Sequence, residues 1–80
     1  MSERLKFKGR LQEKKQEAAR LKLLLDGERE GLRDLIDPIE PLENLKADAI
    51  AAQSLEFSTR IIRYREVLSE IKLIEKTLSA

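Results

Sequence analysis

The chain of 80 residues contains no cysteine and no histidine. Without cysteine it forms no disulfides, and without either residue it lacks the thiolate and imidazole ligands of common zinc sites. The same two absences remove the usual nucleophile and the usual general base of enzyme catalysis. We therefore expect a protein that is not an enzyme and that binds no metal ion or cofactor. The lack of cysteine also fits a reducing cytoplasm.

Long hydrophobic runs are missing as well. No stretch approaches the roughly 20 apolar residues of a membrane span, and residues 1–8 show neither the apolar run nor the cleavage-site pattern of a secretory signal. Aromatic residues make up only 4% of the chain, whereas hydrophobic residues make up 41% and charged residues 39%. Such a composition is typical of long helices and coiled coils. We expect one helical domain over 1–80, located in the cytoplasm and not bound to membranes.

The chain has only two prolines, Pro38 and Pro41, and they divide it into two halves. Proline disfavours helical geometry at the residue before it, so the first helix should end near Asp37. We predict a helix over 2–36 that starts at Ser2 and Glu3, a loop over 37–41 and a second helix over 42–78. Asp37 followed by Pro38 also reads as a capping signal for that second helix.

Apolar residues recur every seven residues in both halves of the chain. The two repeats are Leu11, Ala18, Leu25 and Leu32, and then Ile50, Phe57, Tyr64, Ile71 and Leu78. A seven-residue repeat places one apolar seam along a helix, and that seam needs a partner. Two such seams around a proline-containing stop predict an all-α fold, an antiparallel two-helix coiled-coil hairpin. The predicted seam contains Phe7, Leu11, Ala18, Leu21, Leu25, Phe57, Ile61, Tyr64, Leu68 and Ile71.

The register of this hairpin can be predicted by matching facing residues. Setting Ala18 against Ile61 places a small side chain opposite a large one, which suits dense packing. The same register sets Lys14 against Tyr64, so that the lysine stem lies along the ring.

Two of the three glycines, Gly27 and Gly31, lie inside the first predicted helix. Their spacing of four residues places them on one face of that helix. They mark either a tolerated irregularity or a close approach by another backbone.

Further apolar residues fall outside the predicted seam: Leu23, Leu24, Leu55, Ile62, Val67, Leu73 and Ile74. Two helices cannot cover so wide a stripe, and soluble monomers seldom expose one. A hairpin of this size also needs stabilisation from elsewhere, and without disulfides or a metal ion a partner subunit is the remaining route. We predict a homodimer in which two hairpins form a four-helix bundle. The contact face of this dimer contains Leu24, Leu55, Ile62, Val67 and Ile74. If the chain does not form a dimer, we expect an unidentified protein partner to bind this face.

The net charge of +1 is spread unevenly along the chain. Residues 1–22 carry eight basic and three acidic side chains, whereas residues 23–50 carry three basic and eight acidic ones. The loop end of a hairpin is then acidic and its open end basic, which favours antiparallel pairing of two copies.

The basic N-terminal cluster supports an alternative function. It contains Arg4, Lys6, Lys8, Arg10, Lys14 and Lys15. Basic side chains on a helix bind phosphates with release of counterions, so this cluster predicts a nucleic-acid-associated accessory protein. No base-reading motif accompanies it. The sequence thus predicts a non-enzymatic protein–protein interaction module first and a nucleic-acid accessory protein second.

Overall fold

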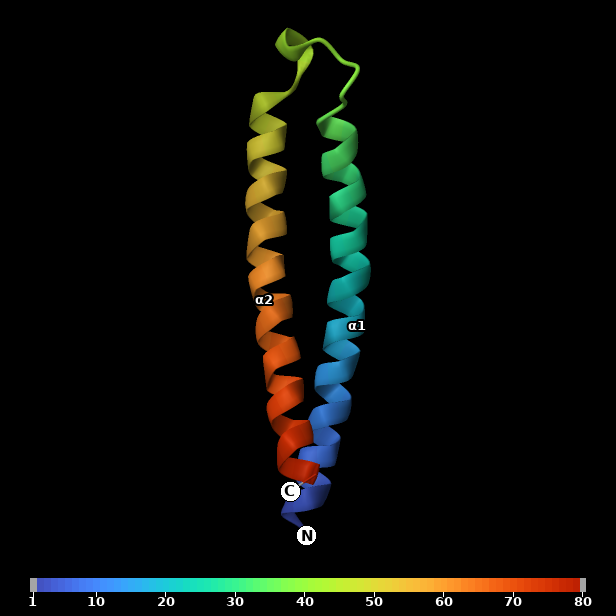
Figure 1. Ribbon diagram of the computed structural model, residues 1–80, viewed down its shortest axis with the longest axis vertical. Coiled ribbons are helices and arrows are strands. Elements are labelled where there is room, and N and C mark those ends of the chain that lie inside the picture. The colour runs from blue at the N-terminus through green and yellow to red at the C-terminus, as the bar shows by residue number, and fades with distance from the viewer. Residues whose placement is uncertain (1, 80) are drawn as a thin grey trace.

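The computed structural model describes residues 2–79 and forms an antiparallel helical hairpin (Figure 1). Helix α1 spans Glu3–Leu35, a single turn of 3₁₀ helix, η1, spans Leu42–Asn44, and helix α2 spans Ala47–Ser79. The two long helices lie side by side, and together the described residues extend over 62 × 17 × 15 Å. Both chain ends lie at one end of the hairpin, the open end, and residues 36–46 form the other end, the tip. The predicted hairpin is confirmed.

Helix α1 begins and ends close to the predicted positions. The side-chain oxygen of Ser2 accepts a hydrogen bond from the backbone N–H of Arg4 at 3.1 Å, so Ser2 is the N-cap of a helix that starts where it was predicted to. At the other end, Ile36 still donates its N–H to the carbonyl of Leu32 at 2.9 Å, but the helix ends at Leu35. Pro38 explains this end, because it restricts the residue before it to non-helical geometry.

The connection between the helices is longer than predicted. The sequence placed the start of the second helix at residue 42, whereas α2 begins at Ala47. Asp37 does not cap α2; its carboxylate accepts a hydrogen bond from the N–H of Ile39 at 2.9 Å and stabilises a turn within the tip. Pro41 precedes η1, and Leu45 then adopts extended geometry at φ −68° and ψ 139°. Packed helix axes lie about 8–10 Å apart, so the chain needs a non-helical segment to cross from one to the other.

The seam between the helices is built largely from the predicted residues. Leu21 and Leu25 of α1 are buried, and most of the remaining predicted positions are half-buried. Those half-buried positions are Phe7, Leu11, Ala18, Phe57, Ile61, Tyr64 and Ile71. The seven-residue repeat therefore identified the side of each helix that faces the other.

Three residues of α2 differ from the prediction. Val67 and Ile74, which the sequence assigned to an outer contact face, are buried in the seam, and Val67 is 0% exposed. Leu68, predicted in the seam, is 37% exposed. Val67 and Leu68 follow Tyr64 by three and four residues, so they flank the seam on opposite sides. In Figure 1 the two helices come closer together toward the open end, and there the buried flank of α2 is the one that carries Val67 and Ile74.

The register is also shifted from the predicted one. Lys14 pairs with Glu70 instead of lying opposite Tyr64, and Lys15 lies 3.8 Å from Glu75. Both lysines thus reach residues that lie further along α2 than predicted. The longer tip accounts for the shift, because α2 starts later and each position on α1 meets a later residue of α2.

Candidate interaction surface

Three large aliphatic side chains form a row on the outer side of α2. Leu55, Ile62 and Leu73 are 70%, 57% and 65% exposed. Leu55 and Leu73 are 18 residues apart, which is five full turns at 3.6 residues per turn, and Ile62 lies within about 20° of both. We call these three residues the outer row. Helical geometry places it on the side of α2 opposite Phe57, Tyr64 and Ile71 of the seam.

The outer row includes two of the five residues predicted for a contact face, Leu55 and Ile62. Leu73 was predicted to lie outside the seam but not to belong to that face. Leu73 follows Ile62 by 11 residues, and this spacing could have assigned it to the same face, because 11 residues complete nearly a whole number of helical turns.

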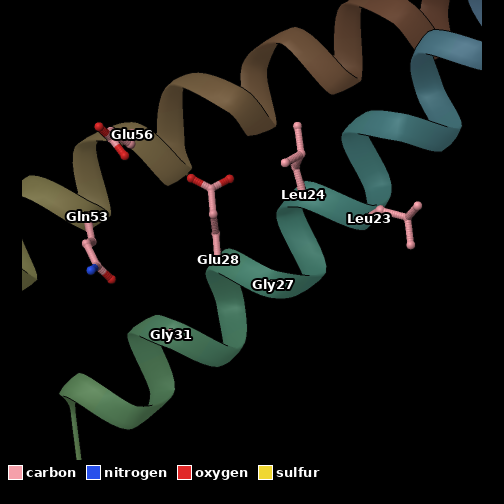
Figure 2. Close-up of a pocket in the computed structure, with 7 residues that line it drawn as sticks. All are labelled: Leu23, Leu24, Gly27, Glu28, Gly31, Gln53 and Glu56. Carbon is pink, nitrogen blue, oxygen red and sulfur yellow. The ribbon is translucent and has the colours of Figure 1, made fainter.

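Leu24, the third predicted contact residue that stays exposed, lies on α1 at the edge of a separate hollow. This hollow of about 460 Å³ is shallow and is lined by Leu23, Leu24, Gly27, Glu28, Gly31, Gln53 and Glu56. Figure 2 shows Leu24 and Glu28 pointing toward α2, with Leu23 pointing away. Leu24 is 46% exposed, so the hollow leaves it in contact with solvent.

The two glycines of this hollow have no close neighbour in the hairpin. A Cβ atom added at Gly27 would meet nothing within 4 Å, and one added at Gly31 would lie 3.6 Å from the side-chain oxygen of Gln53. Neither glycine has a positive φ. Within residues 2–79, they are therefore tolerated irregularities of α1, and no backbone approaches them closely.

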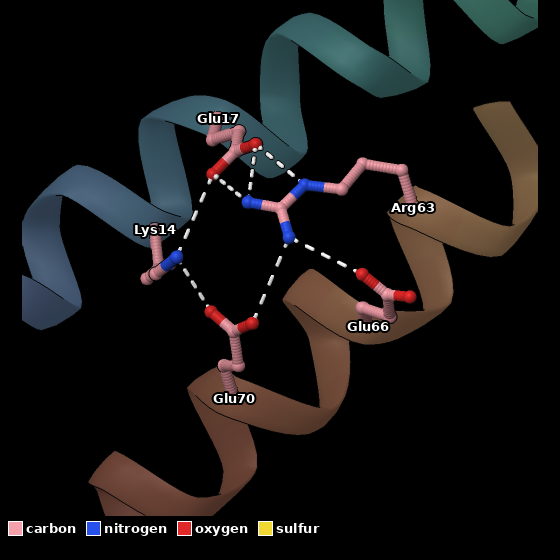
Figure 3. Close-up of polar contacts among 5 residues, drawn as sticks. All are labelled: Lys14, Glu17, Arg63, Glu66 and Glu70. Carbon is pink, nitrogen blue, oxygen red and sulfur yellow. Dashed lines mark hydrogen bonds and ion pairs between the residues drawn. The ribbon is translucent and has the colours of Figure 1, made fainter.

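A network of charged side chains joins the two helices near their middle (Figure 3). The guanidinium of Arg63 donates to both carboxylate oxygens of Glu17, at 3.0 and 3.1 Å, and to Glu66 at 3.3 Å. Lys14 pairs with Glu70, whose second oxygen lies 3.7 Å from Arg63. These contacts fix the register of α1 against α2, because Lys14 and Glu17 belong to one helix and their partners to the other.

The network also changes proton affinities. Hydrogen bonding to Glu17, and then to Glu66, raises the pKa of Arg63 above its ordinary value. Hydrogen bonding from Lys14, the largest cause, together with the charges of Lys14 and Arg63, lowers the pKa of Glu70. Both shifts favour the charged forms that make the contacts. The network was not predicted from the sequence, because Lys14 was expected to lie along Tyr64 and not to reach Glu70.

The predicted nucleic-acid cluster is divided by these contacts. Lys14 and Lys15 already face carboxylates, Glu70 and Glu75, so their charges are partly neutralised. Two of the six predicted phosphate contacts are thus engaged within the hairpin.

The other four basic residues stay together at the open end. Arg4 donates to the backbone carbonyl of Leu78 at 3.0 Å, and the guanidinium of Arg10 lies 5.7 Å from the centre of the Phe7 ring. The side chains of Lys6 and Lys8 are exposed, and neither forms an ion pair with residues 2–79.

The tip has the opposite character. Its carboxylates at Asp37, Glu40 and Glu43 are exposed, as are the aliphatic side chains of Ile39 and Leu42. The acidic tip and the basic open end predicted from the sequence are therefore at opposite ends of a hairpin that extends over 62 Å.

Comparison of the chain with protein-family models, with curated proteins and with solved structures found no match in any of the three. Over residues 2–79, no helix combines the length and the apolar character needed to cross a membrane.

Proposed function

We propose that the chain is a non-enzymatic interaction module, a helical hairpin that associates with a second copy to form a four-helix assembly. The observation that carries this proposal is the imbalance between core and surface. Within residues 2–79 the core of buried apolar side chains is limited to Leu21, Leu25, Val67 and Ile74, whereas ten large aliphatic side chains are exposed. Three of them, Leu55, Ile62 and Leu73, are aligned on one side of α2, and aligned exposed apolar side chains favour a site of association.

Burial of apolar surface favours the association of two hairpins over an isolated hairpin. Removing apolar surface from water contributes roughly 25 cal/mol per Å², or about 1.5–3 kcal/mol for each Leu or Ile side chain that becomes fully buried. Leu55, Ile62 and Leu73 make their largest contribution only when another molecule covers them. A chain of 80 residues with a narrow seam gains proportionally more from such burial than a large domain does.

Sedimentation equilibrium of the wild type and the Ile62→Asp variant tests the proposal. We expect the wild type to be a dimer at low-micromolar concentration, and Ile62→Asp to be a monomer because it buries a charge in the contact. Ile39→Asp makes the same chemical change in the tip and should remain dimeric. Helical content, followed by circular dichroism, separates dissociation from unfolding. A wild type that sediments as a monomer would contradict self-association and leave the exposed face to an unidentified protein partner.

A second candidate function, a nucleic-acid-associated accessory protein, is supported by the exposed Lys6 and Lys8 at the open end. Its test replaces Arg4, Lys6, Lys8 and Arg10 with glutamine and measures binding to DNA and RNA. The candidate requires wild-type binding that weakens steeply between about 50 and 200 mM salt and is lost in the variant. Unchanged binding in the variant would reject it. A cytoplasmic location stays a prediction from the sequence.

A further inference from the structure

A second seven-residue pattern runs along the outside of α2 and includes the outer row. Its positions alternate in steps of four and three residues, as the core positions of a coiled coil do. They are Leu55, Thr59, Ile62, Glu66, Ser69 and Leu73. All six positions are exposed in the hairpin, so this pattern is free to meet another helix.

The pattern reads nearly the same from both ends. Counted outward from residue 64, Leu55 corresponds to Leu73 and Thr59 corresponds to Ser69. When two identical helices pack antiparallel about a two-fold axis, each residue faces its counterpart in the other copy. Leucine then meets leucine at both ends of the contact, and small hydroxyl side chains meet between them. Such self-complementarity is what an antiparallel contact between two copies requires.

Glu66 distinguishes antiparallel from parallel pairing. In a parallel pair it would face Glu66 of the other copy, and two like charges would meet inside the contact. In an antiparallel pair it faces Ile62 of the other copy, while its carboxylate keeps the hydrogen bond from Arg63 at 3.3 Å. The antiparallel arrangement therefore avoids the contact between two Glu66 carboxylates that parallel pairing would create.

The charge distribution favours the same orientation. Residues 23–50, which include the tip, carry five more acidic than basic side chains, and residues 1–22 carry five more basic than acidic ones. Antiparallel pairing brings the tip of each copy beside the open end of the other, whereas parallel pairing brings like charges together. Charges at these ends are exposed, so the effect orients the copies most strongly at low salt.

We propose that two copies of this chain pair antiparallel through the outer side of α2, with Leu55 of one copy against Leu73 of the other. The acidic tip of each copy lies beside the basic open end of its partner. This inference rests on the proposed self-association and adds the contact surface and the orientation. The contact extends over 18 residues, or about 27 Å of helix at 1.5 Å per residue.

The absence of cysteine makes a direct test simple, because every introduced thiol is unique. Thr59→Cys and Ser69→Cys change side chains of similar size at positions that should face each other across the two copies. A disulfide needs Cβ atoms about 3.5–4.5 Å apart, so it forms only between facing positions. We mix the two variants, one carrying an affinity tag, and oxidise them under mild conditions. The expected product is the mixed 59–69 dimer, with little 59–59 or 69–69 dimer.

Ser54→Cys is the matched control. Ser54 is on the same helix and half-buried on the side that faces α1, so its thiol should form no disulfide between copies. Sedimentation equilibrium of each reduced variant shows whether it associates as the wild type does.

The outcomes separate this inference from the proposed function. A wild-type dimer whose thiols form 59–59 and 69–69 products overturns the orientation and leaves self-association standing. A wild-type dimer that forms no disulfide at either position overturns the outer side of α2 as the contact. A monomeric wild type overturns both.

Charge reversal gives an independent readout of orientation. At about 50 mM salt we expect Glu40→Lys with Glu43→Lys to weaken dimerisation roughly tenfold, because a basic tip then meets a basic open end. Adding Lys72→Glu and Lys76→Glu, two exposed positions at the open end of α2, to the same chain should restore the wild-type affinity. In a parallel pair the second set of substitutions would not restore the affinity, because the tip of one copy would still lie beside the tip of the other and carry the same charge.

Discussion

At the scale of single residues, the neighbours Val67 and Leu68 show how narrowly side chains are divided between core and surface. Both are aliphatic and both lie next to the seam, yet Val67 is buried and Leu68 is largely exposed. Helical geometry puts them on opposite flanks of Tyr64, and only the position of α1 selects which flank is buried. The contribution of each residue to stability therefore depends on packing more than on hydrophobicity.

Val67→Ala should destabilise the hairpin by about 2 kcal/mol, because it deletes buried methyl groups and leaves a cavity. Ile39→Ala, in the exposed tip, should change the free energy of unfolding by less than about 0.5 kcal/mol. Urea denaturation followed by circular dichroism at one fixed protein concentration measures both. If Val67→Ala instead left unfolding unchanged and only dissociated the dimer, Val67 would belong to a contact between copies, as the sequence first indicated.

At the scale of elements, α1 tolerates two glycines at a cost in helix propensity. Glycine in a helix interior is about 1 kcal/mol less favourable than alanine. Neither Gly27 nor Gly31 is needed for a positive φ or for a close contact between the described residues. Helix α1 is nevertheless continuous through both glycines, because it is anchored on either side of them. Leu25, which precedes the glycines, is buried, and Leu32, which follows them, is half-buried.

Gly27→Ala should therefore stabilise the hairpin by about 1 kcal/mol, since the added methyl group meets open space and restricts the unfolded chain. The effect should appear as a higher midpoint in urea and as more helical signal. Dimerisation should not change, because Gly27 lies on α1, outside the proposed contact on α2. A loss of dimer in Gly27→Ala would show that a second copy approaches the backbone there.

At the scale of the whole molecule, apolar contacts hold the helices together and charged contacts fix how they are aligned. The network of Lys14, Glu17, Arg63 and Glu70 links α1 to α2 at a single register. The surplus charges remain at the two ends of the hairpin. The chain thus has ion pairs that align its two helices and, at its two ends, surplus charges of opposite sign.

Hairpin stability should fall on acidification in a way that depends on Glu70. Folding lowers the pKa of Glu70, chiefly through its hydrogen bond with Lys14, so its carboxylate stabilises the folded state at neutral pH. This contribution is fully present above the ordinary glutamate pKa of about 4.3 and is lost as the pH falls below it, through the folded value.

The measurement compares the urea midpoints of the wild type and Glu70→Gln from about pH 7 to about pH 3. The two curves should differ at neutral pH and approach each other at the acidic end. Glu30→Gln, which removes a charge from the exposed side of α1, controls for net charge. If the urea midpoint of the wild type stayed above that of Glu70→Gln below about pH 3, the ionised carboxylate of Glu70 would not be the source of the stability difference.

Much of the hairpin could be predicted from the sequence because it follows from short-range rules. The seven-residue repeat identified the inner sides at Leu21, Leu25 and Tyr64, and Ser2 and Pro38 set the bounds of α1. The candidate surface was predicted only in part. Leu24, Leu55 and Ile62 are exposed as expected, whereas Val67 and Ile74 are not.

By itself, then, the sequence determined two long helices, their antiparallel arrangement, and an acidic tip opposite a basic open end, since periodicity, proline and charge act locally. Only the tertiary structure decided where α2 begins, which residues of α1 and α2 face each other, and that Val67 is in the core. The physical reason is that these features depend on how the chain crosses at the tip and on the angle between the helix axes. Both are properties of two elements packed together, and neither is encoded in the pattern of one.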